Sequence, residues 1–446
     1  MSDSSFSYSS DTFKQITRDI LDQALQQGAS ACEAEVSEGF GQSVTVRHDE
    51  VETIEYNRDK GIGVTVYIGK QRGHASTSDL SPQAIKDTVK AALSIAKFTA
   101  SDEFSGLADA NLLAKDVPDL DLYHPWGQSV EESIAQAKAC EAAAFSVDKR
   151  IGNSEGATVG TQESHFIYGN SLGFMGGYAS SRHSISCAMI AESEQGMQRD
   201  YWYTTARDPG DLDNAQSVGL RAGERTVRRL DARKLPTMQV PVLYEASLAS
   251  GLLSHFVSAV SGGSLYRKSS FLLDSLSQEI FAPFIEIKEL PHLAKGLASA
   301  PFDNEGVATH ARDVVSKGVL QGYFLGSYSA RKLGMVTTGN AGGNHNLILS
   351  STGQDFAQLL KMMDKGLLVT ELLGQGVNPV TGDYSRGAAG FWVEHGEIQY
   401  PVEEITIAGN LKDMFKGIVA VGNDVLIRGS KQCGSILVDR MTIAGE

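Results

Sequence analysis

A long stretch of two-residue alternation, from Ala157 to Thr205, places the tightest limit on the fold. Apolar and polar residues alternate there, with many Ser, Thr, Tyr and Gly, and this period is typical of β-strands with one buried face. Shorter stretches before it, around Val44–Val46, Val51–Tyr56 and Ile62–Ile68, follow the same rule. The chain has 46 glycines in 446 residues without a G-X-Y period, which favours a β-rich or mixed fold over a helical bundle.

Helical patterns flank these strands. Four amphipathic segments carry capping or helix-ending signals, and they are expected near residues 11–28, 82–95, 129–147 and 211–230. The stretch 231–236 breaks the pattern, so we place a domain boundary there. We predict an α+β protein: a disordered Ser-rich tail over 1–10, a mixed helix and sheet domain over 11–235, and a Gly-rich domain over 236–446. That last domain should be β-barrel-like or a rolled sheet with helices, opening with a strand at 240–244 and a helix at 246–260.

The overall charge argues against a nucleic-acid partner. With 39 Lys and Arg against 54 Asp and Glu, the chain carries −15 and would on average repel phosphates. The basic run Arg228–Lys234 is typical of a helix end, where cations favour the helix dipole. Four isolated cysteines without a C-x-x-C fit a reducing cytoplasm, and neither a signal sequence nor a membrane span is evident. We therefore expect a cytoplasmic protein without direct nucleic-acid or membrane contact.

The chain offers no recognisable catalytic constellation. No H-E-x-x-H is present, and no two of the ten histidines lie within five residues of each other. The string Gly169–Gly173 matches G-x-S-x-G, but β patterns on both sides favour a hairpin turn over a nucleophile elbow. The string Gly339–His345 is either a set of turn glycines or a backbone cradle for an anion. Cys433 defaults to a small buried hydrophobe.

Four strings in the second half carry a family resemblance. They are SGLLSHF at 250–256, SYSARKLG at 327–334, TGDYSRGAAGFW at 381–392 and EITIAGNL at 404–411. Together they resemble the TldD/PmbA family of peptidase-related proteins, specifically its PmbA (TldE) branch, and the first half agrees more loosely. The resemblance implies a heterodimer of a TldD-type and a PmbA-type subunit that encloses a chamber. It implies a cytoplasmic peptidase for unfolded or extended peptides, linked to peptide-antibiotic maturation and antitoxin turnover.

In the TldD branch, an H-E-x-x-x-H helix and a later Cys hold zinc. Alignment on the preceding Leu-Leu pair puts Ser254 and Ala259 at the two His positions and His255 at the Glu position. A methyl group and a neutral hydroxyl are poor replacements for imidazole at zinc. The stretch before Cys433 is shorter than its TldD counterpart, so Cys433 is not assigned as a ligand. We expect no catalytic residue and no cofactor in this chain, with the zinc in the TldD-type partner.

We therefore expect this chain to be the subunit of the heterodimer that does not cleave peptides. Tyr384, Ser385, Arg386 and Gly387 are predicted either to face the peptide or to form a core strand with its turn. When the partner is missing, two copies of the chain could also pair as a homodimer through related β-domains. Two other functions stay open: a stand-alone hydrolase with a Ser or Cys and a His brought together by the fold, and a regulator that binds a DNA-associated enzyme, as the family's other name, modulator of DNA gyrase, suggests.

Overall fold

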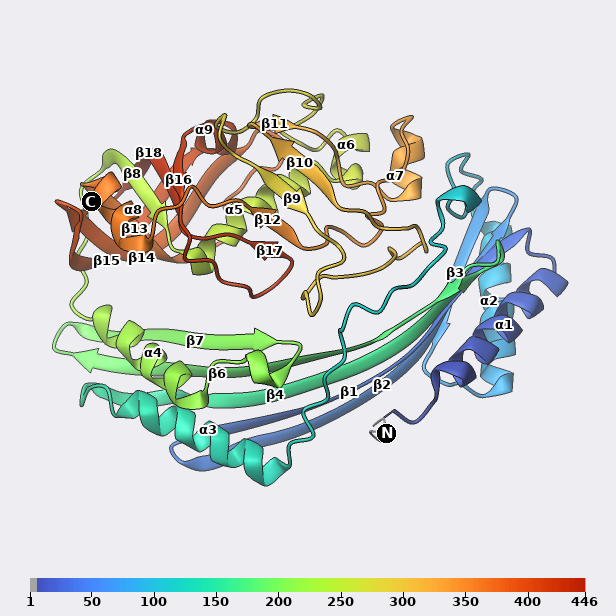
Figure 1. The fold of residues 1–446 in the computed structure, drawn as a ribbon, viewed down its shortest axis with the longest axis horizontal. Helices are drawn as coiled ribbons and strands as arrows, with labels where there is room; N and C mark the ends of the chain where they lie inside the picture. Colours follow the sequence, from blue (N-terminus) through green and yellow to red (C-terminus); the bar gives the residue numbers. More distant parts are fainter. Residues whose placement is uncertain (1–5, 446) are drawn as a thin grey trace.

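The first half of the chain builds one long, curled sheet. The computed structural model describes residues 6–445, and in Figure 1 this sheet sweeps across the lower part of the molecule. Its strands pair antiparallel in the order β3-β2-β1-β4-β6-β7, and β5 forms a hairpin with β4. The strands are β1 (Ala31–Arg47), β2 (Glu50–Ile68), β3 (Gln71–Thr77), β4 (Ile151–Asn170), β5 (Met175–Gly176), β6 (Ala179–Ser193) and β7 (Gly196–Ala206). The predicted alternation over 157–205 is confirmed.

Alternate residues of β1 point to opposite faces of the sheet. Cys32, Ala34 and Val36 are buried against helices, whereas Glu33 and Glu35 point to the opposite face and line hollows beneath the second half of the chain. One pair of helices covers one end of the sheet and a second pair covers the other (Figure 1). They are α1 (Ser10–Gln26) with α2 (Pro82–Phe98), and α3 (Val130–Phe145) with α4 (Ala215–Arg228). Two short 3-10 turns, η1 (Ala110–Leu112) and η2 (Pro209–Asp211), lie in the connections.

Side-chain caps set the helix starts. The Ser129 hydroxyl accepts from the Glu132 amide, and the Glu132 carboxylate accepts from the Ser129 amide, which closes a capping box on α3. Ser9 caps α1. The predicted tail reaches into the described residues only from 6 onward, and there it is packed: the Phe6 ring centroid lies 4.2 Å from that of His165. Residues 1–5 of the predicted tail lie outside the described residues.

A closed barrel forms the outer part of the second half. Five strands close into a ring because β15 pairs with β18 as well as with β14, and β16 adds to the outside of β18. This confirms the predicted barrel-like sheet. The strands are β8 (Met238–Tyr244), β13 (Gly366–Leu373), β14 (Asp383–Glu394), β15 (Glu397–Asn410), β16 (Ile418–Val421) and β18 (Ile436–Ala444).

The largest core lies around α5 (Ala246–Ala259), between the barrel and a second, five-stranded sheet. That sheet has the order β11-β10-β9-β12-β17. Its strands are β9 (Ile287–Glu289), β10 (Arg312–Ser316), β11 (Val319–Leu320), β12 (Leu347–Leu349) and β17 (Lys431–Gln432). Short helices complete this half: α6 (Gly262–Tyr266), α7 (Ser327–Lys332), α8 (Phe356–Met363) and α9 (Leu411–Lys416).

A buried carboxylate organises the glycine-rich string after α7. Glu289 is 1 % exposed, and its oxygens accept from Arg312 Nε at 2.7 Å, Asn340 Nδ2 at 2.8 Å, and the amide and Nδ1 of His345 at 2.8 and 3.1 Å. Burial opposes ionisation, but the hydrogen bonds from His345 and the charge of Arg312 outweigh it and lower the pKa of Glu289 to about 2. The glycines of the string take turn conformations, with positive φ at Gly339, Gly342 and Gly343, and the string contacts the Glu289 carboxylate through Asn340 and His345.

The string Gly169–Gly173 is the turn between β4 and β5. The amide of Asn170 donates to the Phe174 carbonyl at 3.0 Å, and Gly173 takes a positive φ of 96°. The Ser171 hydroxyl accepts from the Cys32 amide at 3.0 Å, so it holds β1 in place. The predicted hairpin turn is confirmed.

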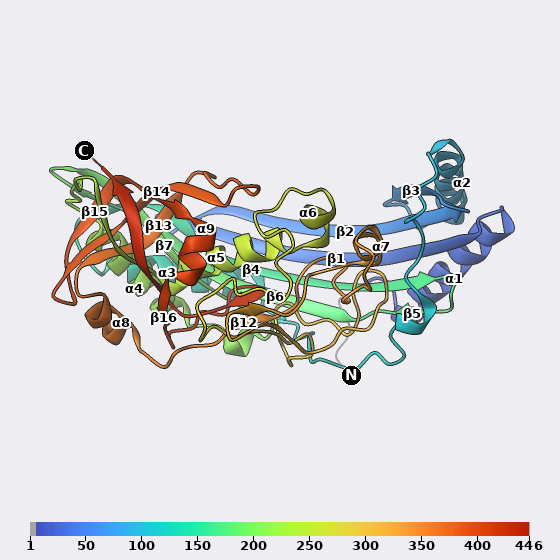
Figure 2. The same ribbon diagram turned by 90° about the horizontal axis from the view of Figure 1, so that it is seen from above.

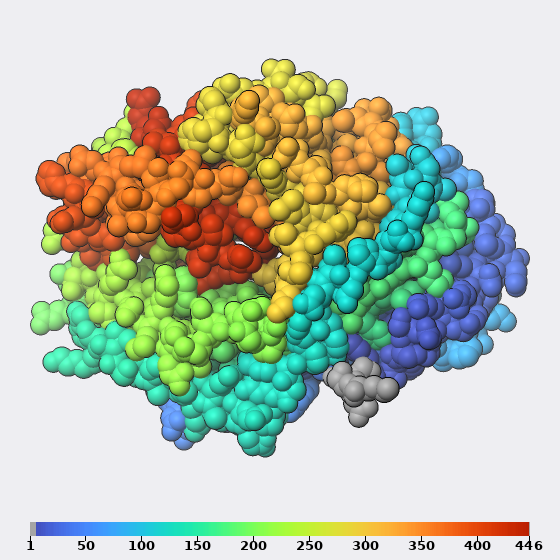
Figure 3. All heavy atoms as spheres, in the orientation of Figure 1, coloured from blue at the N-terminus to red at the C-terminus, as the bar shows by residue number. Residues whose placement is uncertain are grey.

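The two halves of the chain meet through main-chain carbonyls. The Arg331 guanidinium of α7 donates to carbonyls of Phe104 and Gly106, and Arg207 after β7 donates to those of Gly296 and Leu297. Figure 2 shows the second half lying along the curled sheet, and Figure 3 shows the seam between the two halves. In the described part of the chain, no helix is both long and apolar enough to cross a bilayer.

Candidate functional site

Helix α5 carries the positions that the sequence singled out. Leu252, Leu253 and Phe256 are buried in the core and fix its orientation. The Ser254 hydroxyl donates back to the Ser250 carbonyl at 3.1 Å, so it is already used within the helix. His255 points toward β14, where its ring meets that of Tyr384 edge to face at 6.0 Å.

The predicted segment 384–387 lies on β14 beside α5. Tyr384 is only 2 % exposed, Ser385 is exposed, and Arg386 and Gly387 are half-buried. β15 pairs with this segment on one side. On the other side the Ser385 amide donates to the Gly376 carbonyl at 2.6 Å, and Leu373 pairs with Gly387. The main chain here is therefore not an open edge, and any contact with a peptide would come from side chains.

Two polar atoms of this segment are buried without a hydrogen-bond partner among the described residues: the Tyr384 hydroxyl and Arg386 Nε. Burial, and then the nearby charge of Arg386, lower the pKa of His255. The imidazole is therefore neutral at neutral pH, next to a permanent cation. A positive charge beside the single imidazole weakens it as a cation ligand.

These residues do not fit a zinc ion. Ala259 has no donor atom, the Ser254 hydroxyl serves the helix backbone, and His255 alone supplies one nitrogen where zinc needs three or four ligands. Cys433 is 1 % exposed, and burial, with a smaller effect from Asp424, raises the pKa of its thiol to about 12. Across residues 6–445, no group of three or more His, Cys, Asp or Glu is arranged to hold a metal. The Ser254 hydroxyl donates to the helix backbone and the His255 ring contacts Tyr384, so these two neighbours do not form a nucleophile–base pair on α5.

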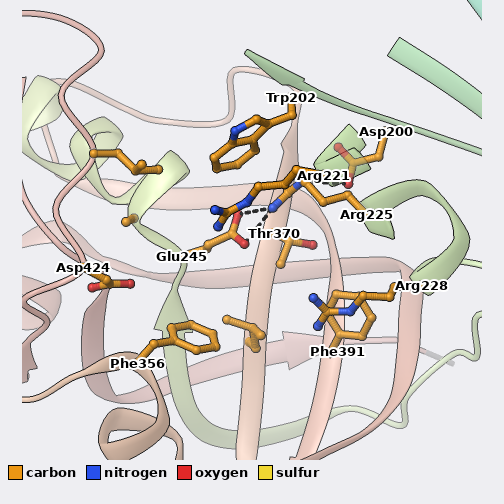
Figure 4. A pocket seen from close by; sticks show the side chains of 13 residues that line it. Asp200, Trp202, Arg221, Arg225, Arg228, Glu245, Phe356, Thr370, Phe391 and Asp424 are labelled. Carbon is orange, nitrogen blue, oxygen red and sulfur yellow. Dashed lines mark hydrogen bonds and ion pairs between the residues drawn. The ribbon is translucent and has the colours of Figure 1, made fainter. Parts of the chain in front are cut away.

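A cavity opens at the first turn of α5 (Figure 4). It has a volume of about 310 Å³ and lies between the end of the curled sheet and the barrel, with walls from β7, α4, α5, β13 and β14. Its lining combines charged residues with aromatic and aliphatic ones. They are Asp200, Trp202, Arg221, Arg225, Arg228, Glu245, Ala246, Phe356, Leu368, Thr370, Phe391, Asp424 and Leu426.

Three arginines of α4 reach this cavity. Arg225 is neutralised there: its Nη1 lies 2.8 and 3.0 Å from the Glu245 carboxylate oxygens, and its Nε lies 3.4 Å from Asp200. Arg221 and Arg228 are exposed and stack on aromatic rings, with guanidinium carbons 4.1 Å from the Trp202 centroid and 4.7 Å from that of Phe391.

This cluster was not predicted from the sequence, because the basic end of α4 also fits the helix dipole. The available signal was the spacing of four and then three residues between Arg221, Arg225 and Arg228, which puts the three side chains on one helix face. The walls from β7 and the barrel gave no comparable signal.

Comparison with known proteins places the chain in a family. Three family models match it: domain 1 of the PmbA/TldA metallopeptidases over residues 32–96, their central domain over 123–230, and their C-terminal domain over 237–445. The chain belongs to the PmbA/TldD family. It is 52% identical to the metalloprotease PmbA of Escherichia coli O157:H7, covering 96% of this chain and 97% of that one. It is 50% identical to a PmbA homolog of Haemophilus influenzae, over 95% and 94% of the two chains.

Solved structures show the same PmbA/TldD fold. A crystal structure from Bacteroides thetaiotaomicron, described as a modulator of DNA gyrase, matches with a TM-score of 0.93 at 29% identity, over 98% of this chain and all of that one. TldE from Thermococcus kodakarensis matches with a TM-score of 0.85 at 18% identity, over 96% and 100%, which shows a shared fold.

Proposed function

We propose that this chain is the zinc-free, non-catalytic subunit of a heterodimeric peptidase whose TldD-type partner holds the zinc and cuts the peptide. The observation that carries the proposal is the donor set on α5: a hydroxyl used by the helix backbone at 254 and a methyl group at 259. Without a bound metal there is no acidified water and no Lewis acid for the amide carbonyl on this chain. The relatives named metalloprotease would then owe that activity to the assembly.

The role of this subunit would be to complete a chamber around an extended peptide and to help hold it. The face of the curled sheet that carries Glu33 and Glu35 borders hollows beneath the second half of the chain, and these hollows offer polar walls for such a chamber. Family resemblance supplies the expected setting, which is the cytoplasm, and the expected substrates, which are unfolded peptides, antibiotic precursors and antitoxins.

A reconstitution assay tests the proposal. An unstructured reporter peptide is incubated with this chain alone, with its TldD-type partner alone, and with the mixture, each with and without a zinc chelator. We expect cleavage only in the mixture, abolished by the chelator, and less than one zinc per chain by elemental analysis of this subunit alone. Stoichiometric zinc on this chain, or cleavage by it alone, would contradict the proposal.

A stand-alone thiol or serine hydrolase finds little support in the geometry. The Cys433 thiol is buried with a raised pKa, and Ser254 has no base as its hydrogen-bond partner. Cleavage by this chain alone that survives chelation would nevertheless favour that function.

A regulator of a DNA-associated enzyme is a second candidate, because two structural relatives are described as modulators of DNA gyrase. The net charge of −15 allows such a role through protein contact. A pull-down that recovers gyrase but no TldD-type protein would favour it.

A further inference from the structure

We propose that the cavity at the first turn of α5 binds the C-terminal carboxylate of an extended peptide. This rests on the proposed function in one respect only, namely that peptides are the ligands of the assembly. The proposal comes from the charges and shape of the cavity, which the motif positions on α5 do not explain.

The negative groups in the wall are already matched. Glu245 and Asp200 pair with Arg225, and Asp200 also lies 3.8 Å from Arg229. The Asp424 carboxylate accepts from the amide and the hydroxyl of Ser435, at 2.9 and 2.6 Å. Every carboxylate of the lining therefore has a partner within the protein.

Two positive groups in the wall are not matched. Within residues 6–445, neither Arg221 nor Arg228 forms an ion pair with a carboxylate, and each guanidinium lies against an aromatic ring. Stacking holds the guanidinium plane but leaves its edge, with the N–H donors, open to a ligand. Figure 4 shows Thr370 and the Arg225–Glu245 ion pair between Arg221 and Arg228, and all five residues line the same cavity.

The remaining walls suit the end of a chain better than a folded partner. A volume of about 310 Å³ is at the lower end of the roughly 300–1,000 Å³ of small-ligand pockets. Phe356, Leu368 and Leu426 provide apolar surface for the side chain of a terminal residue.

A binding cycle tests the assignment on this chain alone. The probe is an unstructured octapeptide ending in leucine, labelled at its N-terminus, made once with a free carboxylate and once as the amide. Dissociation constants are measured by fluorescence anisotropy for wild type, for the double variant Arg221→Gln/Arg228→Gln, and for Arg233→Gln. Arg233 is the matched control, since it is also exposed and its guanidinium also stacks on a ring, that of Tyr400 at 4.5 Å, but it lies outside the cavity.

The peptide with a free C-terminal carboxylate should bind wild type and Arg233→Gln about tenfold more tightly than the peptide amide does, as expected for one or two charge-assisted hydrogen bonds. In the double variant this ratio should fall to about one, while the thermal midpoint stays that of wild type. Equal binding of acid and amide by wild type, absence of binding, or a ratio that survives in the double variant would overturn the proposal. Displacement of the acid peptide by inorganic phosphate at lower concentration than by acetate would also overturn it.

The two proposals fail separately. A ratio of about one together with cleavage by the reconstituted mixture would refute the carboxylate site and leave the subunit role standing. A tenfold ratio of the two dissociation constants, without peptide cleavage by the reconstituted mixture, would support the carboxylate site and refute the subunit role.

Discussion

The charge of Glu289 should make the stability of this protein fall in acid by an amount that one substitution removes. Its pKa drops from 4.5 to about 2 on folding, and each pKa unit corresponds to about 1.36 kcal/mol. The folded state should therefore gain about 3 kcal/mol from this one carboxylate at neutral pH. Since the pKa is depressed on folding, this gain is complete above pH 4.5 and is lost as the pH falls toward about 2.

The variant Glu289→Gln should be about 3 kcal/mol less stable than wild type at pH 7, because Arg312 loses its buried counter-charge. At about pH 3.5 the linkage relation leaves about 2 kcal/mol, so the stability difference between wild type and Glu289→Gln narrows by about 1 kcal/mol. Urea denaturation at both pH values measures it. Glu155→Gln is the control, because Glu155 forms an exposed ion pair with Arg199 and should change stability by less than about 1 kcal/mol. If the free energy of unfolding changed with pH by the same amount in wild type and in Glu289→Gln, the reasoning would be refuted.

Three further predictions concern packing. Gly219→Ala should lower the free energy of unfolding by about 1–3 kcal/mol in urea denaturation, because its Cβ would lie 1.9 Å from a carbonyl oxygen of α3. Gly251→Ala is the control: it has open space around it and should be neutral or stabilising by up to about 1 kcal/mol. Equal effects of the two substitutions would contradict this prediction. Cys433 should resist iodoacetamide at pH 8 in the folded chain and react after unfolding, as read by mass spectrometry. Phe6→Ala should lower stability by about 1 kcal/mol through lost contact with His165, and an unchanged midpoint would show that this part of the tail is not anchored.

Much of the fold follows from local patterns. Alternation predicted the curled sheet, capping residues predicted the helices around it, and paired β patterns predicted the turn at Gly169–Gly173. Strand length was harder to predict. β2 runs unbroken from Glu50 to Ile68, whereas the sequence indicated two shorter strands at 51–56 and 62–68. Residues 50–60 are exposed on both faces, and the polar run 57–60 interrupts the apolar pattern.

The candidate site was less predictable because its parts lie far apart in the chain. The chemistry of positions 254 and 259 could be judged from residue type alone, since a side chain without a donor atom cannot ligate. The cavity, by contrast, joins α4 with Glu245, Thr370 and Asp424, which are separated by up to about 200 residues. Likewise no local pattern indicates that Glu289 will be buried, because the hydrogen-bond partners of its carboxylate come from strand β10 and from the loop before β12.

The length of β1 and β4 has a mechanical consequence. Each strand runs from beneath α1 and α2 at one end to beneath α3 and α4 at the other, so two separate apolar clusters share the same backbone ladder. If one helix pair unfolded, the β1–β4 hydrogen bonds beneath it would break, and the strands beneath the other helix pair belong to the same ladder. Amide protons under both helix pairs should therefore exchange with deuterium through a common opening event, because the sheet unfolds as one cooperative unit.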